Sequence, residues 1–523
     1  MEYQRTIREL LEYRAHATPD WVFGIHEDWQ ISCSTLYGCV NRLANGLTEI
    51  GVTPGQHVAV MLGNHPDHIF TIFALAELGA VWVPVNVNLR GPSLDFLFEK
   101  SAPHTVIADG DFWNRLAPVL ANKNVKKVIV RNASNVVSPS DRMKVVDFPA
   151  ITGGKTASPH TTPSLDEIRC ISFTSGTTGE PKGVLLTERM LLTFARGAAI
   201  ASEVRTGDVF LLWEPLYHNS GVQICILALM EQVTLAIIPK FSASRFWDQI
   251  RKYQVTKMHY LGGVIDILLK YPANPNDQDH NVQLAFGGGC SVNGWKAFQN
   301  RFGIRIQEVY GLTEASGFST INQSGKIGSI GKPYPYFEIK IADDEGKPLG
   351  PRKIGEIVIR ENEAGLITQG YLENPEATAQ ALRGGWLYTG DLGCYDEEGD
   401  FYYKGRMKDS IRRRGENISA WEVERVLNSH PKIEESAVIV VDADVGEQEL
   451  KAFIKSAAGS TLEPLEIIKW CESLLAYYQI PRYVIFVDSF EKTPTERIRK
   501  ENLSKETTDG WDLERSGYKI ERK

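Results

Sequence analysis

Residues 174–183 read Thr-Ser-Gly-Thr-Thr-Gly-Glu-Pro-Lys-Gly and directly follow the apolar run Cys-Ile-Ser-Phe at 170–173. This pattern is typical of a strand that runs into a loop of small, hydroxylated and glycine residues. Glycines let backbone amides approach an anion, hydroxyls donate further hydrogen bonds, and Lys182 supplies a positive charge. The spacing fits neither Gly-x-x-x-x-Gly-Lys-Ser/Thr nor Gly-x-Gly-x-x-Gly. A flexible surface loop is the alternative for this composition, but the string favours a phosphate-holding loop.

The loop resembles the phosphate loop of the adenylate-forming enzymes, the superfamily of acyl-CoA synthetases, adenylation domains and firefly luciferase. Further motifs of that superfamily follow in the expected order. They are Pro215-Leu216-Tyr217-His218, Gly287-Gly288-Gly289, Tyr310-Gly311-Leu312-Thr313-Glu314, Tyr388-Thr389-Gly390-Asp391 and Gly405-Arg406-Met407-Lys408-Asp409. Ordered motifs over this length of chain argue against chance similarity.

Composition narrows the class of protein. The chain has 523 residues, 43% hydrophobic and 23% charged, which is ordinary for a globular protein of two to four domains. A net charge of −8 gives no global attraction for nucleic acid or anionic lipid. The apolar stretch 69–85 is interrupted by Glu77, Gly79 and Pro84, so no membrane span is expected. Seven scattered cysteines without Cys-x-x-Cys, and no signal-peptide core, indicate a cytoplasmic protein.

Periodicity predicts an α/β fold. A helix over 35–50 and apolar runs at 58–61, 127–130, 234–238 and 282–286 indicate stacked, mainly parallel sheets. The stretch 137–163 is interpreted as a loose surface connection. Acidic turns at 343–346 and 396–399 indicate hairpins of a small β-barrel over about 328–405. Helices near 421–429 and 464–478 and strands at 437–441 and 450–454 indicate a small α+β domain. We therefore expect a large N-terminal domain, 1–407, and a small C-terminal domain, 408–523; the resemblance implies that the latter is mobile about Lys408.

The resemblance implies a reaction in two halves. A carboxylate first attacks the α-phosphate of ATP to give an acyl-adenylate and pyrophosphate, and the thiol of CoA then displaces AMP. Because charge builds on the phosphoryl oxygens and on departing pyrophosphate, the first half needs cations around the polyphosphate. We expect ATP, Mg²⁺, CoA and a small carboxylic acid as partners, and a homodimer is left open.

The motif positions assign nucleotide-binding residues by resemblance. Glu314 and Thr178 fit the Mg²⁺ position, and Asp391 can accept hydrogen bonds from both ribose hydroxyls. Tyr310 is expected to stack on adenine, which lies against the bare backbone of 287–289. The full expected ATP-binding set is Thr174, Ser175, Gly176, Thr177, Thr178, Gly179, Lys182, Gly287, Gly288, Gly289, Tyr310, Gly311, Thr313, Asp391 and Arg406.

The C-terminal third carries the remaining expected roles. Lys408 is the expected hinge between the half-reactions. The stretch Arg414-Gly415-Glu416 is expected to face CoA, although a solvated charge run explains its arginine equally well. The family usually ends in a Gly-Lys pair, whereas here Arg497 occupies the place of that lysine. Arginine keeps the charge but is longer and planar, which leaves the rate of adenylation in question. The expected catalytic residues are Arg497, Glu314, His218 and Lys182.

The acid is less constrained than the reaction. Trp213, Tyr217, His218 and Tyr260 lie in segments that line the family's acyl pocket. Amino-acid activators place an aspartate near the position of His218, so its absence favours an acyl-CoA synthetase. The stretches 241–247 and 415–424 look most like those of bacterial crotonobetaine/carnitine-CoA ligases, and aromatic rings can receive a quaternary ammonium. A short, medium, branched or aromatic acid is the alternative.

The sequence is compatible with other functions as well. The Arg497 departure would also suit a protein that binds acyl or nucleotide groups but has lost adenylation. An adenylation enzyme that loads a carrier-protein thiol, and a luciferase-like oxygenase that uses the same adenylate, are further alternatives.

Overall fold

The computed structural model describes residues 5–134, 136–159, 161–174, 180–290, 292–407, 411–413, 416–418, 420–442, 448–491, 498 and 500–520. The chain divides into two units. The first comprises Met1–Val87, Ser101–Ser172 and Gly183–Gly405, and the second comprises Asn88–Lys100, Phe173–Lys182 and Arg406–Lys523. Each unit has its own hydrophobic core. The predicted boundary at residue 407 and the hinge at Lys408, which lies outside the described residues, stay predictions.

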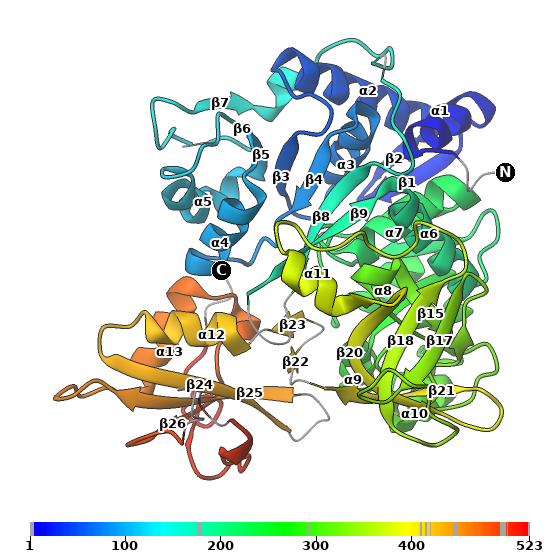
Figure 1. Ribbon diagram of the computed structural model, residues 1–523. Coiled ribbons are helices and arrows are strands. Elements are labelled where there is room, and N and C mark those ends of the chain that lie inside the picture. Colours follow the sequence, from blue (N-terminus) through cyan, green and yellow to red (C-terminus); the bar gives the residue numbers. More distant parts are fainter. Residues whose placement is uncertain are drawn as a thin grey trace. The chain divides into compact units, whose positions relative to one another are not determined.

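A seven-stranded sheet follows the order β7-β6-β5-β3-β4-β8-β9 (Figure 1). Its pairings from β7 to β8 are parallel. The strands are β3 (His57–Met61), β4 (Val81–Pro84), β5 (Thr105–Asp109), β6 (Lys127–Arg131), β7 (Lys144–Asp147), β8 (Ile168–Thr174) and β9 (Lys182–Thr187). The central strands are continuous apolar runs because both faces of the sheet are buried.

A nine-stranded sheet follows the order β16-β15-β14-β13-β12-β10-β11-β1-β2. Its pairings are parallel from β14 to β1 and antiparallel at both edges. The strands are β1 (Val22–His26), β2 (Trp29–Ser32), β10 (Val209–Leu212), β11 (Thr234–Ile237), β12 (Lys257–Leu261), β13 (Leu284–Gly288), β14 (Arg305–Leu312), β15 (Gly317–Ile321) and β16 (Lys332–Pro333). The carboxyl ends of β12, β13 and β14 therefore meet at one edge.

Helices surround these sheets. The helix α3 ends before Gly79, which adopts a left-handed φ of 70°, so this glycine interrupts the apolar stretch 69–85. The helix α7 is buried almost all round, so it lies inside the core rather than on the surface. The helices of the first unit are α1 (Ile7–Ala17), α2 (Cys33–Glu49), α3 (Pro66–Leu78), α5 (Trp113–Leu120), α6 (Glu188–Ser202), α7 (Asn219–Glu231), α8 (Phe246–Lys252), α9 (Gly262–Lys270), α10 (Val292–Phe302) and α11 (Pro375–Ala381), whereas all but the last residue of α4 (Gly91–Ser101) belongs to the second unit.

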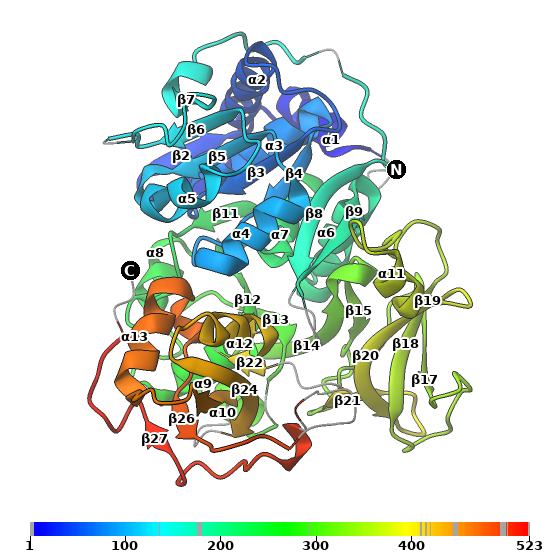
Figure 2. The same cartoon turned by 60° about the vertical axis from the view of Figure 1, so that its left-hand side comes forward.

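The predicted barrel part forms a five-stranded sheet with the order β17-β18-β20-β19, and β21 pairs with β20 (Figure 2). The strands are β17 (Phe337–Ala342), β18 (Gly355–Glu361), β19 (Leu382–Arg383), β20 (Trp386–Tyr395) and β21 (Phe401–Arg406). A bridge between Gly331, which directly precedes β16, and Phe401 joins β21 to the edge of the nine-stranded sheet. Both predicted acidic turns are present, with Gly346 and Gly399 each at a φ of 80°.

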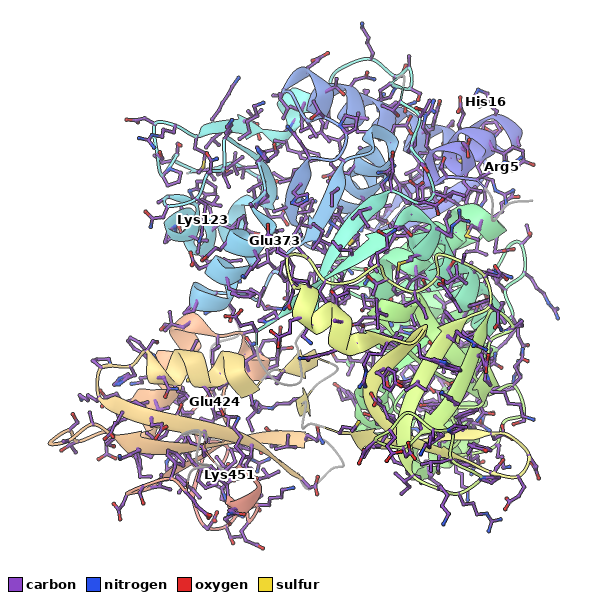
Figure 3. All side chains as sticks on the ribbon, in the orientation of Figure 1. Arg5, His16, Lys123, Glu373, Glu424 and Lys451 are labelled. Atoms are coloured by element: carbon purple, nitrogen blue, oxygen red, sulfur yellow. The ribbon has the colours of Figure 1, made fainter. Side chains whose placement is uncertain are left out.

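The second unit contains a four-stranded sheet with the order β24-β25-β26-β27. Its elements are β22 (Ile411–Arg413), β23 (Glu416–Ile418), α12 (Ala420–Asn428), β24 (Ile433–Asp442), β25 (Gln448–Ser456), α13 (Pro464–Leu474), β26 (Tyr483–Phe486) and β27 (Trp511–Asp512). Figure 3 labels Glu424, whose Oε1 lies 2.5 Å from Lys500 Nζ, and Lys451, whose Nζ lies 2.6 Å from Asp509 Oδ1. These ion pairs tie the C-terminal chain to the helix and sheet of its own unit.

The sequence interpretation of residues 137–163 is wrong in part. This stretch contains β7, which extends the parallel sheet beside β6, and a 3₁₀ turn at Phe148–Ile151. Phe148 and Ile151 are buried, and a Cβ placed on Gly46 of α2 would lie 2.0 Å from the Ile151 carbonyl oxygen. The turn is therefore packed against α2. Among the described residues, no helix combines the length and apolar character needed to cross a bilayer.

Candidate active site

The glycine triplet lies at the carboxyl end of β13, where neighbouring strands approach it closely. A Cβ on Gly287 would lie 1.9 Å from the Tyr260 carbonyl oxygen, and one on Gly288 would lie 2.9 Å from the Val309 carbonyl oxygen. Gly289 has a φ of 88°, a conformation that disfavours other residues. Bare backbone is thus required here by packing, and it leaves a flat surface at the strand end.

A buried carboxylate holds this glycine loop in place. Glu308 on β14 is 5% exposed, and its Oε1 accepts hydrogen bonds from the backbone N–H groups of Gly289 at 2.5 Å and Cys290 at 3.2 Å. Its Oε2 accepts the hydroxyl of Tyr260, which is fully buried on β12. Burial, together with the neighbouring Glu308 charge, raises the pKa of Tyr260 well above its usual range, so the phenol remains a donor.

Tyr310 and Asp391, which are 81 positions apart, lie together. The Tyr310 hydroxyl donates to Asp391 Oδ2 at 2.7 Å, and Asp391 is 3% exposed. The turn before Asp391 is fixed by Gly390, which has a φ of 71° and donates its N–H to Glu356 Oε1 at 2.8 Å. Burial is the main cause of the raised pKa of Glu356, and the Asp391 charge adds to it.

Glu314 lies in the 3₁₀ turn Thr313–Ala315 that follows β14. Its Oε1 accepts the hydroxyl of Tyr371 at 3.0 Å, and its backbone carbonyl accepts the N–H of Thr368 at 2.8 Å. The preceding Gly311 is required by packing, since a Cβ there would lie 1.8 Å from the Gly317 carbonyl oxygen. The structure therefore places Gly287–Gly289, Tyr310 and Glu314 at or just beyond the carboxyl ends of β13 and β14, and it brings Asp391 of β20 to Tyr310.

The predicted acyl-pocket residues divide into two pairs by burial. Trp213 and Tyr260 belong to one core cluster, and Trp213 Nε1 donates to the His259 carbonyl oxygen at 3.0 Å. Tyr217 and His218 are partly exposed, and their ring centroids lie 4.8 Å apart at the start of α7.

A second buried carboxylate supports this acyl segment, defined here as residues 213–218. Glu214 Oε1 lies 2.7 Å from His259 Nδ1, and these side chains are 1% and 3% exposed. Glu214 Oε2 accepts the N–H of Trp213 at 3.1 Å. Asn64 fixes the same segment, because it donates to the Glu214 carbonyl oxygen at 2.8 Å and accepts the N–H of Leu216 at 2.9 Å.

The phosphate loop groups with the second unit. Thr174 ends β8 and Lys182 begins β9, and the Thr174 hydroxyl donates to the Lys182 carbonyl oxygen at 3.4 Å. The structure does not describe the side chains of Arg406 and Glu416. The predicted site residues that lie wholly outside the described residues are Ser175, Gly176, Thr177, Thr178, Gly179, Lys408, Arg414, Gly415 and Arg497. The part of the chain that the structure describes contains no group of three or more His, Cys, Asp or Glu side chains arranged to hold a metal.

Comparison with known families agrees with this geometry. The model of the AMP-binding enzyme family matches residues 11–372, which include the whole glycine loop, Tyr310 and Glu314. The chain belongs to that family. The model of the AMP-binding enzyme C-terminal domain matches residues 422–497.

Individual relatives support the same class. The chain is 32% identical over 482 residues to a crotonobetaine/carnitine–CoA ligase of Salmonella typhi, covering 91% of this chain and 93% of the relative. An o-succinylbenzoate CoA synthetase of Bacillus subtilis in complex with its acyl-adenylate intermediate is 25% identical with a TM-score of 0.68, covering 96% and 99% of the two chains. A double mutant of that synthetase bound to a product analogue has a TM-score of 0.82 at 24% identity and 96% and 99% coverage, which shows the fold alone.

These comparisons confirm the predicted superfamily and the α/β fold. They also confirm the predicted reaction class, an AMP-forming acid–thiol ligase.

Proposed function

We propose that this protein converts a carboxylic acid, ATP and CoA into an acyl-CoA, AMP and pyrophosphate, with its nucleotide site at the carboxyl ends of β13 and β14. The observation that carries the proposal is the pairing of Tyr310 with Asp391 beside the glycine loop, within a chain of the AMP-binding family. Two partners distant in sequence are needed to build it, so an unrelated turn would not reproduce it.

In this proposal each group on the first unit has one task. The flat backbone of Gly287–Gly289 receives adenine, and Glu308 keeps that surface in position. Tyr310 orients the carboxylate of Asp391, which accepts the ribose hydroxyls. Thr174 and Lys182 are assigned to the phosphates, Lys408 to the hinge and Arg414 to CoA on the resemblance of their motifs.

The residues present fit a magnesium ion. Glu314 offers a hard carboxylate whose Oε1 is already oriented by the Tyr371 hydroxyl. Thr178, which lies outside the described residues, is assigned to the same ion on the resemblance of its motif alone. Bound Mg²⁺ would neutralise charge on the phosphate oxygens. Tyr371 keeps the Glu314 side chain from turning away.

The acid is proposed to meet Tyr217 and His218, because they are the partly exposed members of the predicted pocket. Trp213 and Tyr260 are assigned to the layer behind them. The relatives named for crotonobetaine and carnitine make betaine acids the first candidates. Short, branched and aromatic acids are the competing candidates.

A screen for pyrophosphate release tests the proposal. Betaine, linear, branched and aromatic acids are supplied with ATP and Mg²⁺, with and without CoA, and the nucleotide product is separated. AMP and pyrophosphate in equal amounts are expected, with acyl-CoA formed only when CoA is present. ADP as the stoichiometric product would overturn the proposal.

Variants of Arg497 distinguish a ligase from a protein that binds acyl or nucleotide groups without catalysing adenylation. Arg497→Ala should reduce acyl-adenylate formation about 100-fold, the scale of losing a preorganised charge at a developing anion, whereas Arg497→Lys should stay active. The alanine variant should still convert supplied acyl-AMP and CoA to thioester. A wild type that is inactive with every acid but active as Arg497→Lys would favour the binding protein.

A further inference from the structure

The seven-stranded sheet has a topological switch point that lies apart from the nucleotide motifs. Five of its strands follow the order β4-β3-β5-β6-β7, all parallel (Figure 1). The chain leaves β3 toward β4 on one side and leaves β5 toward β6 on the other. In open parallel sheets, ligands bind outside the carboxyl ends of strands at such a point. The relevant edge here lies between the ends of β3 and β5.

A cavity of about 560 Å³ elsewhere is lined by Asp396 and other residues of the acidic hairpin, whereas the cavity at this sheet edge has tryptophan and phenylalanine rings in its wall. It measures about 510 Å³, within the range of small-molecule pockets. Its apolar wall comes from Trp29, Leu43, Phe70 and Phe148. Trp29 is 42% exposed, and its ring meets Phe70 edge to face at 6.1 Å, so a flat apolar surface faces the opening. None of these residues belongs to the candidate active site.

The two arginines of the cavity lining differ in whether a carboxylate pairs with them. Arg131 is held by Asp109, with Nε–Oδ1 at 2.6 Å and Nη2–Oδ2 at 3.0 Å, and by Asp67 at 3.3 Å. His65 and Arg131 keep the pKa of Asp67 below its usual value despite burial. Arg42, in contrast, contacts Cys39 Sγ at 3.3 Å and has no carboxylate partner among the described residues.

A second donor faces the same cavity. Asn132 follows β6 with a φ of 59°, a conformation that asparagine tolerates, and within the described chain its carboxamide makes no hydrogen bond. A guanidinium and an amide N–H beside a flat apolar wall match a planar acid. One unmatched cation, with Asp67 and Asp109 close by, suits a single negative charge better than a phosphate.

We propose that this switch-point cavity is a second, regulatory site that binds an aromatic carboxylic acid, with its ring on Trp29 and its carboxylate on Arg42. The site is joined to the acyl segment through Asn64. Asn64 lies between Gly63, whose N–H donates to Asp109 at 2.8 Å, and His65 in the cavity wall. Its side chain bonds the Glu214 and Leu216 backbone. A ligand that shifts residues 63–67 therefore acts on the segment proposed to meet the acid substrate.

Binding is tested without ATP or CoA, so the result does not depend on the proposed reaction. The probe is 4-fluorobenzoate, titrated by ¹⁹F NMR against wild type, Arg42→Gln and the control Arg205→Gln, which changes an exposed arginine. Saturable binding is expected in wild type and in the control, with Kd raised at least about tenfold in Arg42→Gln. Neutral 4-fluorobenzamide should bind wild type as weakly as the acid binds Arg42→Gln.

Three results would overturn the site. They are no saturable binding, equal affinity in wild type and Arg42→Gln, and binding lost in His218→Ala but kept in Arg42→Gln. The last result would place the probe at the acyl segment.

The proposed regulatory effect rests on the proposed function, and it is measured separately from binding. Pyrophosphate release is measured with a non-aromatic acid substrate, with and without benzoate. The acid KM of wild type should change at least about twofold, and that change should be absent in Arg42→Gln when each protein is compared with its own benzoate-free KM. A benzoate effect of equal size in both proteins would mean competition at the active site and would overturn the coupling. An acid KM unaffected by benzoate in wild type would overturn it as well.

Discussion

Consecutive residues of β12 hold two buried carboxylates on opposite faces of the same strand. Tyr260 bonds Glu308, and His259 pairs with Glu214. The first carboxylate is tied to the backbone N–H groups of the glycine loop, whereas the second is tied to the N–H of Trp213 at the start of the acyl segment. Because successive side chains of a strand point to opposite faces, one strand supports the proposed nucleotide site and the proposed acid site from different faces.

The two carboxylates differ in the groups that hydrogen-bond to them. Glu308 receives a phenol and main-chain donors of the glycine loop, so these bonds depend little on which acid the enzyme uses. Glu214 is paired with an imidazole and lies beside residues proposed to meet the acid. The comparison therefore predicts that changes at Glu308 affect ATP, and that changes at Glu214 affect the acid.

Glu308→Ala should have the largest effect. The change leaves the buried Tyr260 hydroxyl without this acceptor, at a cost of about 1–3 kcal/mol, and it removes the acceptor of the partly buried Gly289 and Cys290 N–H groups, which releases the glycine loop. The KM for ATP should rise about 30-fold or more, with the acid KM within about twofold of wild type. Both constants come from pyrophosphate release at saturating levels of the other substrate.

Glu308→Gln is the matched control for size. It keeps one acceptor oxygen for the loop and should give an intermediate KM for ATP. Thermal melting shows whether each variant is folded. A folded Glu308→Ala with an unchanged ATP KM would mean that the carboxylate supports the core and not the nucleotide site.

Glu214→Gln should have the next largest effect, on the other substrate. The substitution replaces one acceptor oxygen by a donor, so either His259 or the N–H of Trp213 loses its partner. The acid KM should rise about fivefold, the size of one net hydrogen bond, while the ATP KM stays near wild type. Glu49→Gln, at an exposed position of α2, is the control. Equal rises in the acid KM and the ATP KM would contradict the prediction that the two faces of β12 act on different substrates.

The sequence predicts the motif residues of the candidate site better than the distant side chains that support them. Gly287–Gly289, Tyr310, Glu314 and Asp391 lie in contiguous motifs that can be recognised in the sequence without the fold. The supporting partners come from distant segments. Tyr371 is 57 positions from Glu314, Tyr260 is 48 from Glu308, and His259 is 45 from Glu214. No spacing rule connects such pairs, because the fold alone brings them together.

The same reasoning applies to the fold. Long apolar strands and the helix α2 are predictable because their periodicity is local, and they are confirmed within a few residues. The strand β7 was missed because its exposed lysine and aspartate ends resemble a loop, and only pairing with β6 makes it a strand. The switch-point cavity draws its wall from five separate segments, so no motif indicates it.

Tyr260→Phe should have the smallest effect and decides between two roles for that residue. The sequence assigns Tyr260 to the acyl pocket, whereas its hydroxyl bonds Glu308 on the nucleotide side. Phenylalanine keeps the ring and removes only that donor, and Glu308 Oε1 still holds Gly289 and Cys290. The ATP KM should therefore rise about threefold, a fraction of the Glu308→Ala effect, and the acid KM should not change. A rise confined to the acid KM would instead place the Tyr260 hydroxyl in contact with the substrate acid. In that case β12 would serve the acid from both of its faces.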